Sequence, residues 1–222
     1  MSQSGNPPFS LVHLNLVLPF AQTLHRFLAG SARIVDDFRL RSPRQQIRGH
    51  KRRKRVFEAA ILPVSTQLLS VEKNLDYLLF PDNTPEKVQH LVDNLQSVRL
   101  RLQALEATYT AAESESPELM RSLDSLNEKW RKRIRSELEK WAQLEQPDNL
   151  IKDWSTRSIL SQEMEQRLGK LQQDKDLNEV DTLALRNIYA VIGSAQSLLD
   201  AMKELGDSMK QIKWNQWAAA RF

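Results

Sequence analysis

The sequence predicts an all-α fold, an elongated antiparallel bundle of about six helices, some of them long and coiled-coil-like. Only 6 of the 222 residues are glycine and 7% are aromatic, a composition that favours long helices over a sandwich or barrel, which would need more turns. Several segments carry apolar residues at steps of three and four, the spacing of one helix face. We expect residues 1–19 to form a flexible or apolar N-terminal arm and residues 20–222 to form a single helical domain.

The first two expected helices lie on either side of a basic stretch. Helical spacing begins at Pro19 and ends near Leu40, before the Ser-Pro dipeptide at residues 42–43. A second helix follows over residues 57–78, and Pro63 inside it should cause a kink because proline lacks the N–H that the helix needs. Residues 11–18 are too few to span a bilayer. Their role stays open between an edge strand, an apolar arm on the bundle and the remnant of a membrane helix.

The third and the last expected helices have the clearest heptad-like spacing. FPDNTPEK at residues 80–87 breaks the chain and restarts it, with Thr84 as N-cap and Pro85 as the first helical residue. The apolar positions of the third helix are Val88, Leu91, Leu95, Val98, Leu102, Leu105 and Tyr109. Those of the last helix are Val180, Ala184, Ile188, Val191, Ala195, Leu198, Met202, Leu205, Met209 and Ile212. We expect both stripes to form intramolecular core rather than a dimer seam, since six helices of one chain can bury one another.

Two further helices are expected between these. An acidic loop, ESESPE at residues 113–118, precedes a fourth helix, and QPDN at residues 146–149 precedes a weaker fifth one. The apolar positions of the fourth are Leu119, Leu123, Leu126, Trp130, Ile134, Leu138, Trp141 and Leu144. Those of the fifth are Leu150, Ile151, Trp154, Leu160, Met164, Leu168 and Leu171. The tryptophans in these stripes are most simply core residues with the indole N–H near a bundle edge.

No residue set in the sequence predicts a reaction. Cysteine is absent, and no glycine-rich phosphate loop, dinucleotide fingerprint or nucleophile elbow occurs. The four histidines are scattered, and the pair Glu86 and His90 is best interpreted as a solvated pair near a helix start. We therefore expect a protein that is not an enzyme, with no catalytic, cofactor-binding or metal residues and no cofactor.

Residues 39–55 form a basic segment without a single acid. The segment holds nine of the 32 Lys and Arg of the chain, which has 28 Asp and Glu in all. The residues outside the segment are therefore net acidic. The candidate anionic-surface-binding residues are Arg39, Arg41, Arg44, Arg48, Lys51, Arg52, Arg53, Lys54 and Arg55. Such a segment suits an anionic membrane surface, at about 1 kcal/mol for each basic residue near the headgroups. It also suits sequence-blind binding to nucleic acid, or it is a solvated helix face with no partner.

The chain ends on KWNQWAAARF, a segment that combines tryptophans with cations. This composition is typical of a membrane–water interface, where the rings lie at headgroup level and the cations extend outward. The candidate membrane-interface residues are Lys213, Trp214, Trp217, Arg221 and Phe222. One interpretation is that this long helix ends at the membrane interface, immediately before a transmembrane segment. The alternative is a terminal helix that folds its tryptophans onto the bundle.

The order of these elements resembles the soluble region of the fusaric acid resistance (FUSC-type) inner-membrane proteins. The resemblance covers residues 20–222 and consists of a basic arginine-rich portion, leucine-rich helices and the long helix at residues 186–222. It implies a parent protein similar to an efflux permease, with this chain as its cytoplasmic helical domain. No binding residue of the family is carried over, since no motif matches.

The function expected from these observations is non-enzymatic. We expect a helical domain of a membrane transport protein that serves assembly or regulation on the cytoplasmic side of the inner (plasma) membrane. Its partners would be an anionic membrane surface and the membrane-embedded parts of the same protein, with self-association as a further expectation. The alternative is a stand-alone helical scaffold or nucleic-acid-associated protein that uses residues 39–55.

Overall fold

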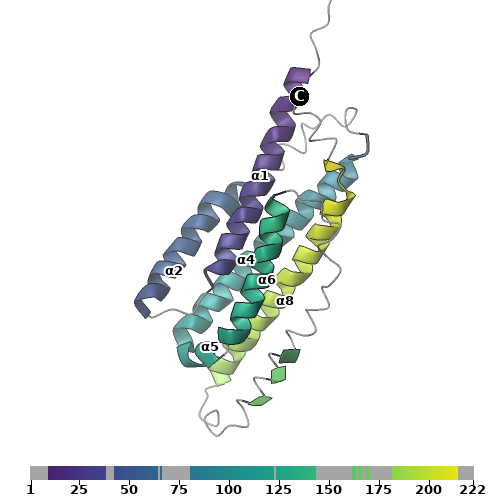
Figure 1. The fold of residues 1–222 in the computed structure, drawn as a ribbon. Helices are drawn as coiled ribbons and strands as arrows, with labels where there is room; N and C mark the ends of the chain where they lie inside the picture. The colour runs from purple at the N-terminus through teal and green to yellow at the C-terminus, as the bar shows by residue number, and fades with distance from the viewer. Residues whose placement is uncertain are drawn as a thin grey trace, which may run out of the picture.

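The part of the chain that the structure describes contains helices and no strands. The structure is a computed structural model that describes residues 10–38, 43–64, 66, 81–122, 124–143, 162–163, 165–166, 169–170 and 182–214. Of these residues 92% are in helices and none is in a strand, which confirms the all-α prediction for this part of the chain. The elements, in order, are α1 (Ser10–Asp36), α2 (Pro43–Val56), the π-helical turn η1 (Phe57–Ile61), α4 (Pro85–Glu115), α5 (Pro117–Ser122), α6 (Asp124–Ala142) and α8 (Thr182–Gln211) (Figure 1).

Helix α1 begins nine residues earlier than the sequence suggested. It starts at Ser10 rather than at Pro19, so residues 10–18 belong to the helix and the predicted helix start at Pro19 was wrong. A proline inside a helix costs one hydrogen bond, but leucine-rich residues on its N-terminal side can still continue the helix. The helix also ends before Leu40, since the backbone N–H of Asp37 closes the last turn on Arg33 and Ile34. No helix in the described residues is long and apolar enough to cross a bilayer.

Helices α4 and α8 pack along their whole length and run in opposite directions. The side chain of Asn83, just before α4, bonds the backbone of Lys213, just after α8. At the other end Asn187 of α8 donates a hydrogen bond to Glu115 of α4. The predicted third-helix stripe from Val88 to Tyr109 is completely buried here, and Ile188, Leu198, Met202, Leu205, Met209 and Ile212 are buried opposite it. The third-helix pattern is therefore confirmed as core, and the last-helix pattern is confirmed at these six positions; Ala184, Val191 and Ala195 are half-buried against the core, and Val180 lies outside the described residues.

Helices α1 and α6 form a second opposed pair. Nδ1 of His25 lies 2.7 Å from the carbonyl oxygen of Ala142, and Arg131 donates to the carbonyl of Asp36 at 3.2 Å. The buried side chains of this pair include Leu24, Phe27, Leu28, Ile34, Val35, Trp130, Ile134, Leu138 and Trp141, as their spacing predicts. Leu144 and nearly all of the predicted fifth helix lie outside the described residues.

Two predicted helix boundaries around α4 differ in their outcome. Thr84 is the N-cap in extended conformation with Pro85 following it, as predicted. A hydrogen bond from the Thr84 side chain to Glu86, together with the backbone N–H of Glu86, lowers the pKa of the Glu86 carboxyl. The predicted acidic loop at residues 113–118 is much shorter than expected, because α4 continues to Glu115 and α5 begins at Pro117.

A π-helical turn lies directly before Pro63, where the sequence predicts a kink. The N–H of Leu62 bonds the carbonyl of Phe57, five residues back, so η1 carries one extra residue in its turn. Proline has no N–H to pair with a carbonyl in the preceding turn, and a wider turn accommodates that loss. This turn packs closely on α1: a Cβ added to Gly30 would lie 2.7 Å from Cβ of Ala60.

Candidate anionic-surface site on helix α2

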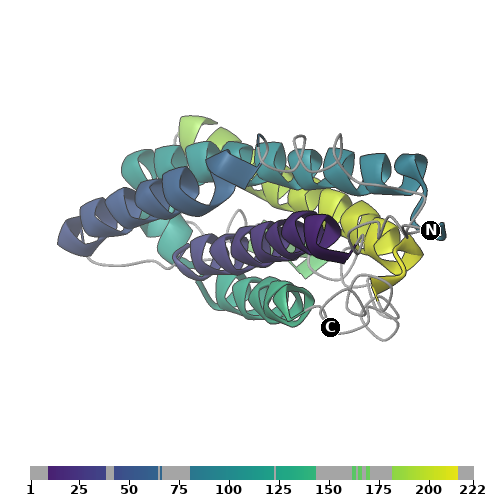
Figure 2. The ribbon, with the colours of Figure 1, turned by 90° about the horizontal axis from the view of Figure 1, so that it is seen from above.

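From residue 43 onward the basic segment is helical and lies on the outside of the molecule. The sequence suggested a stretch between two helices, but residues 43–56 form α2, which continues directly into η1. In both ribbon views α2 is at the edge of the fold (Figures 1 and 2). Of the nine predicted cations, Arg39 and Arg41 lie outside the described residues and Arg44 is in the first turn of α2.

Four of the remaining cations form one stripe along the exposed side of α2. Arg48, Lys51, Arg52 and Arg55 are all exposed. At 3.6 residues per turn they fall within an arc of about 100°, and Arg53 points away from them. We call these four residues the basic stripe. Lys54 is also exposed, but its ammonium group lies beside the stripe and 4.0 Å from the Glu58 carboxylate.

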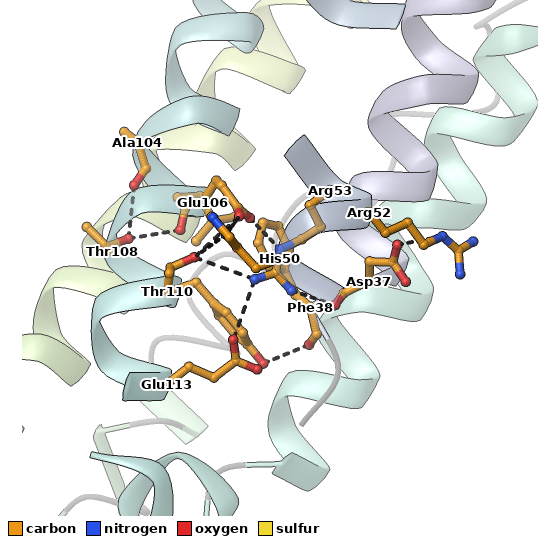
Figure 3. A network of polar contacts seen from close by, with 12 residues as sticks. Asp37, Phe38, His50, Arg52, Arg53, Ala104, Glu106, Thr108, Thr110 and Glu113 are labelled. Atoms are coloured by element: carbon orange, nitrogen blue, oxygen red, sulfur yellow. Dashed lines mark hydrogen bonds and ion pairs between the residues drawn. The ribbon is translucent and has the colours of Figure 1, made fainter. Parts of the chain in front are cut away.

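Arg53 does not belong to the exposed surface, and its assignment to the anionic-surface-binding residues is corrected here. Its side chain is only 1% exposed. Its Nε donates to Glu106 of α4 at 2.5 Å, and one terminal nitrogen reaches Glu113 at 3.5 Å while the other donates to the carbonyl of Asp37 at 3.1 Å (Figure 3). The guanidinium also lies 5.3 Å from the ring centroid of Phe38. Charge-assisted hydrogen bonds of this kind neutralise a buried cation within the protein.

Further contacts surround this arginine and hold α2 to the rest of the fold. The hydroxyl of Tyr109 donates to the carbonyl of Phe38 at 3.0 Å, and the two rings lie 4.8 Å apart. Nδ1 of His50 lies 3.0 Å from a second oxygen of Glu106. Arg52 pairs with Asp37 at 3.0 Å although it is 62% exposed. Although the basic segment contains no acid, Arg52 and Arg53 are therefore paired within the protein, because carboxylates distant in sequence are brought to them.

Three cations of the basic stripe are not paired with a carboxylate among the described residues. Arg48, Lys51 and Arg55 have no carboxylate within ion-pair distance among the described residues. Helix α2 contains no acid of its own, so nothing on the helix offsets these charges. The stripe can therefore attract an anionic surface.

The structure places the first two C-terminal candidates on the bundle. Lys213 is exposed, but its backbone N–H and carbonyl are both bonded by the buried side chain of Asn83. Trp214 is half-buried against the core, and its indole N–H donates to the carbonyl of Met209 at 2.8 Å. Trp217, Arg221 and Phe222 lie outside the described residues.

Sequence reasoning missed the acidic and aromatic partners of Arg53. Glu106 and Glu113 stand seven residues apart on α4, with Tyr109 between them, so all three share one side of the helix. Two acids one heptad apart beside a strictly apolar stripe are a signal for a buried cation from another helix. Asn83 gave no comparable signal, since an asparagine before a helix usually indicates a turn.

The described residues contain no cluster of three or more His, Cys, Asp or Glu side chains that could hold a metal ion. Glu86 and His90 are both exposed on α4. Comparisons of the chain with protein-family models, with curated proteins and with solved structures find no match. Function is therefore inferred from the residues of this chain alone.

Proposed function

We propose that the protein is a non-enzymatic helical domain that binds the anionic surface of a membrane through helix α2. The observation that carries this proposal is the basic stripe: Arg48, Lys51 and Arg55 point outward without a carboxylate partner among the described residues. The buried Arg53 holds the same helix on α4 from its other side. The cations are thereby presented on a fixed helix, and less conformational freedom is lost when they meet a surface.

The strength of such an interaction fits assembly or regulation better than permanent anchoring. At about 1 kcal/mol for each basic residue near the headgroups, the three unpaired cations give a dissociation constant in the millimolar range. Binding of this strength becomes effective when a membrane-embedded part of the same protein raises the local concentration. We therefore propose that the domain belongs to a membrane transport protein of the efflux-permease type and acts on the cytoplasmic side of the inner membrane.

The proposed architecture is an elongated antiparallel bundle of about six helices. The opposed pairs α4 with α8 and α1 with α6 support it, since each is fixed by contacts at both ends. In this proposal residues 150–171 supply the further helix that their apolar spacing predicts.

The C-terminal candidates would form a second contact with the same membrane. Asn83, which holds Lys213, and Glu106, which holds Arg53, are separated by about 35 Å along α4 at a rise of about 1.5 Å per residue. Both regions can reach one flat surface only if α4 lies roughly parallel to it. The proposal therefore includes a bundle that lies along the membrane rather than one that stands upright on it.

Vesicle flotation tests the proposed function directly. The intact chain is mixed with vesicles of phosphatidylcholine alone or with added phosphatidylserine, at low and at high salt. We expect flotation only with the anionic vesicles and loss of binding as the Debye length shortens with salt. A chain that ends after Trp214 keeps the contacts of Asn83 and Met209 and measures the contribution of Trp217, Arg221 and Phe222.

Nucleic acid is the alternative partner, because the same stripe would also neutralise phosphates. Retardation of arbitrary RNA or duplex DNA at low salt, without flotation on either kind of vesicle, would support the scaffold or nucleic-acid-associated function instead. Flotation on anionic vesicles without retardation would reject it.

A further inference from the structure

The exposed side of α2 does not end with its last cation. Beyond Arg55 the same helical run exposes Ala59, Leu62 and Pro63, while Ile61 and Val64 are buried. Leu62 is 41% exposed, one of a few large apolar side chains in the described residues to be so open to solvent. An exposed leucine alone needs no explanation, but its position relative to charge can be informative.

The π-helical turn determines which residues follow the basic stripe. A regular α-helix would continue from Arg48, Lys51 and Arg55 through residues 58 and 62. The extra residue in η1 shifts by one residue the positions that continue the line of the basic stripe. Ala59 and Pro63 therefore follow Arg55 on this side of the helix, and Leu62 lies beside them. We call this exposed side of the helical run the strip: it carries cations over residues 48–55, then the exposed carboxylate of Glu58, and then apolar side chains at residues 59, 62 and 63.

We propose that this apolar end, Ala59, Leu62 and Pro63, inserts into the headgroup region of an anionic lipid surface while the basic stripe contacts the headgroups. This inference rests on the proposed function and specifies how the same site meets its partner. At a lipid surface an interfacial helix buries its apolar face about 5–10 Å into the boundary between headgroups and acyl chains, while its cations contact the headgroups. A phosphate backbone matches the cations but gives an exposed leucine no apolar environment.

Two features suit the strip for shallow insertion. Glu58 is the one acid in residues 43–64, and its carboxylate lies 4.0 Å from the ammonium group of Lys54, which reduces its repulsion of anionic headgroups. The turn that carries Leu62 is held on α1 by the close approach of Ala60 to Gly30. Leu62 is therefore displayed on a packed element.

The absence of cysteine makes the test clean, since one introduced thiol can carry one probe. Leu62→Cys is labelled with an environment-sensitive fluorophore in the full-length chain, and Leu100→Cys on α4 serves as the matched control. Leu100 is another exposed leucine, at 53%, on a helix that is not part of the strip. Vesicles of phosphatidylcholine with phosphatidylserine are added at low salt, and the emission of each probe is recorded.

We expect a blue shift and stronger emission from the probe at residue 62 and no change from the probe at residue 100. In unlabelled protein we expect Leu62→Ala to lower partitioning to these vesicles about fivefold, since alanine transfers less apolar surface from water to the membrane than leucine does. Leu100→Ala should leave partitioning unchanged.

The outcomes separate this inference from the proposed function. Flotation of the protein with no change of the probe at residue 62, and no effect of Leu62→Ala, would overturn the insertion and leave electrostatic binding in place. Absence of flotation would overturn both. A response of the residue-62 probe to RNA and not to vesicles would also contradict insertion into lipid.

Discussion

Arg53 shows how one residue of a basic segment can have a role opposite to that of its neighbours. Four cations surround it in sequence, yet it is the one that faces Glu106 and Glu113 and lies against the ring of Phe38. A buried ion pair adds little net stability compared with apolar residues of the same volume, but removal of one partner is costly. Its effect is to fix how α2 is rotated, and hence which cations are exposed.

We predict that Arg53→Met destabilises the protein by about 3–5 kcal/mol, because two carboxylates of α4 lose their buried partner. Urea denaturation followed by circular dichroism measures this loss. Arg55→Met removes the same charge from the exposed side of the same helix and should change the free energy of unfolding by less than about 0.5 kcal/mol. Equal effects of the two substitutions would show that Arg53 does not anchor α2.

A second prediction at the residue scale concerns the start of α4. Because the hydrogen bond from Thr84 is the first cause of the lowered pKa of Glu86, Thr84→Ala should raise that pKa toward the ordinary glutamate value. An NMR pH titration of the Glu86 side-chain carboxyl carbon measures it in both proteins. An unchanged titration midpoint would mean that the Thr84 hydroxyl does not interact with this carboxylate in solution.

At the scale of elements, the crossing of α1 and η1 depends on a missing side chain. A Cβ at Gly30 would lie 2.7 Å from Cβ of Ala60 and 3.3 Å from Cδ1 of Ile61. The Cβ of Ala60 cannot rotate away, so the two elements would have to separate. A Cβ added at Gly193 of α8, by contrast, would meet nothing within 4 Å.

We therefore predict opposite signs for the same substitution at two glycines. Gly30→Ala should lower the free energy of unfolding by about 1–3 kcal/mol through overpacking, although alanine is the better helix former. Gly193→Ala should raise it by about 0.5–1 kcal/mol. Thermal or urea unfolding measures both, and Ala60→Gly in the Gly30→Ala background should restore part of the loss. Stabilisation by Gly30→Ala would contradict the close crossing.

Helical spacing predicted most of the elements because core positions on long helices repeat with a fixed period. The stripe from Val88 to Tyr109 was predicted residue by residue, and Thr84 and Pro85 gave the start of α4. Boundaries that depend on tertiary packing were missed. Pro19 was taken for a helix start, although proline weakens a helix without necessarily ending it. The helical state of residues 43–56 was missed because cations alone show no apolar period.

At the scale of the whole molecule, the candidate site was only partly predictable. The concentration of positive charge is visible in the sequence. Which cations are exposed is not, because Asp37, Glu106 and Glu113 reach Arg52 and Arg53 only in the folded chain. The fold thus converts a uniform basic segment into an anchored helix with one outward stripe. The separation of Lys213 from this stripe along α4 likewise follows from the pairing of α4 with α8.

The central claim is that position on α2, rather than net charge, makes the protein bind an anionic surface. Flotation on phosphatidylserine-containing vesicles tests this claim. It is compared between two triple variants, each of which removes three positive charges. The first is Arg48→Gln with Lys51→Gln and Arg55→Gln on the basic stripe. The second is Arg101→Gln with Arg186→Gln and Lys203→Gln, three exposed positions on α4 and α8.

At about 1 kcal/mol for each cation near the headgroups, the stripe variant should bind about 100-fold more weakly than the original chain. The control variant should stay within about threefold of it, since none of its three residues lies on the basic stripe of α2. Equal loss of binding in the two variants, or no loss in the stripe variant, would contradict a binding site on α2.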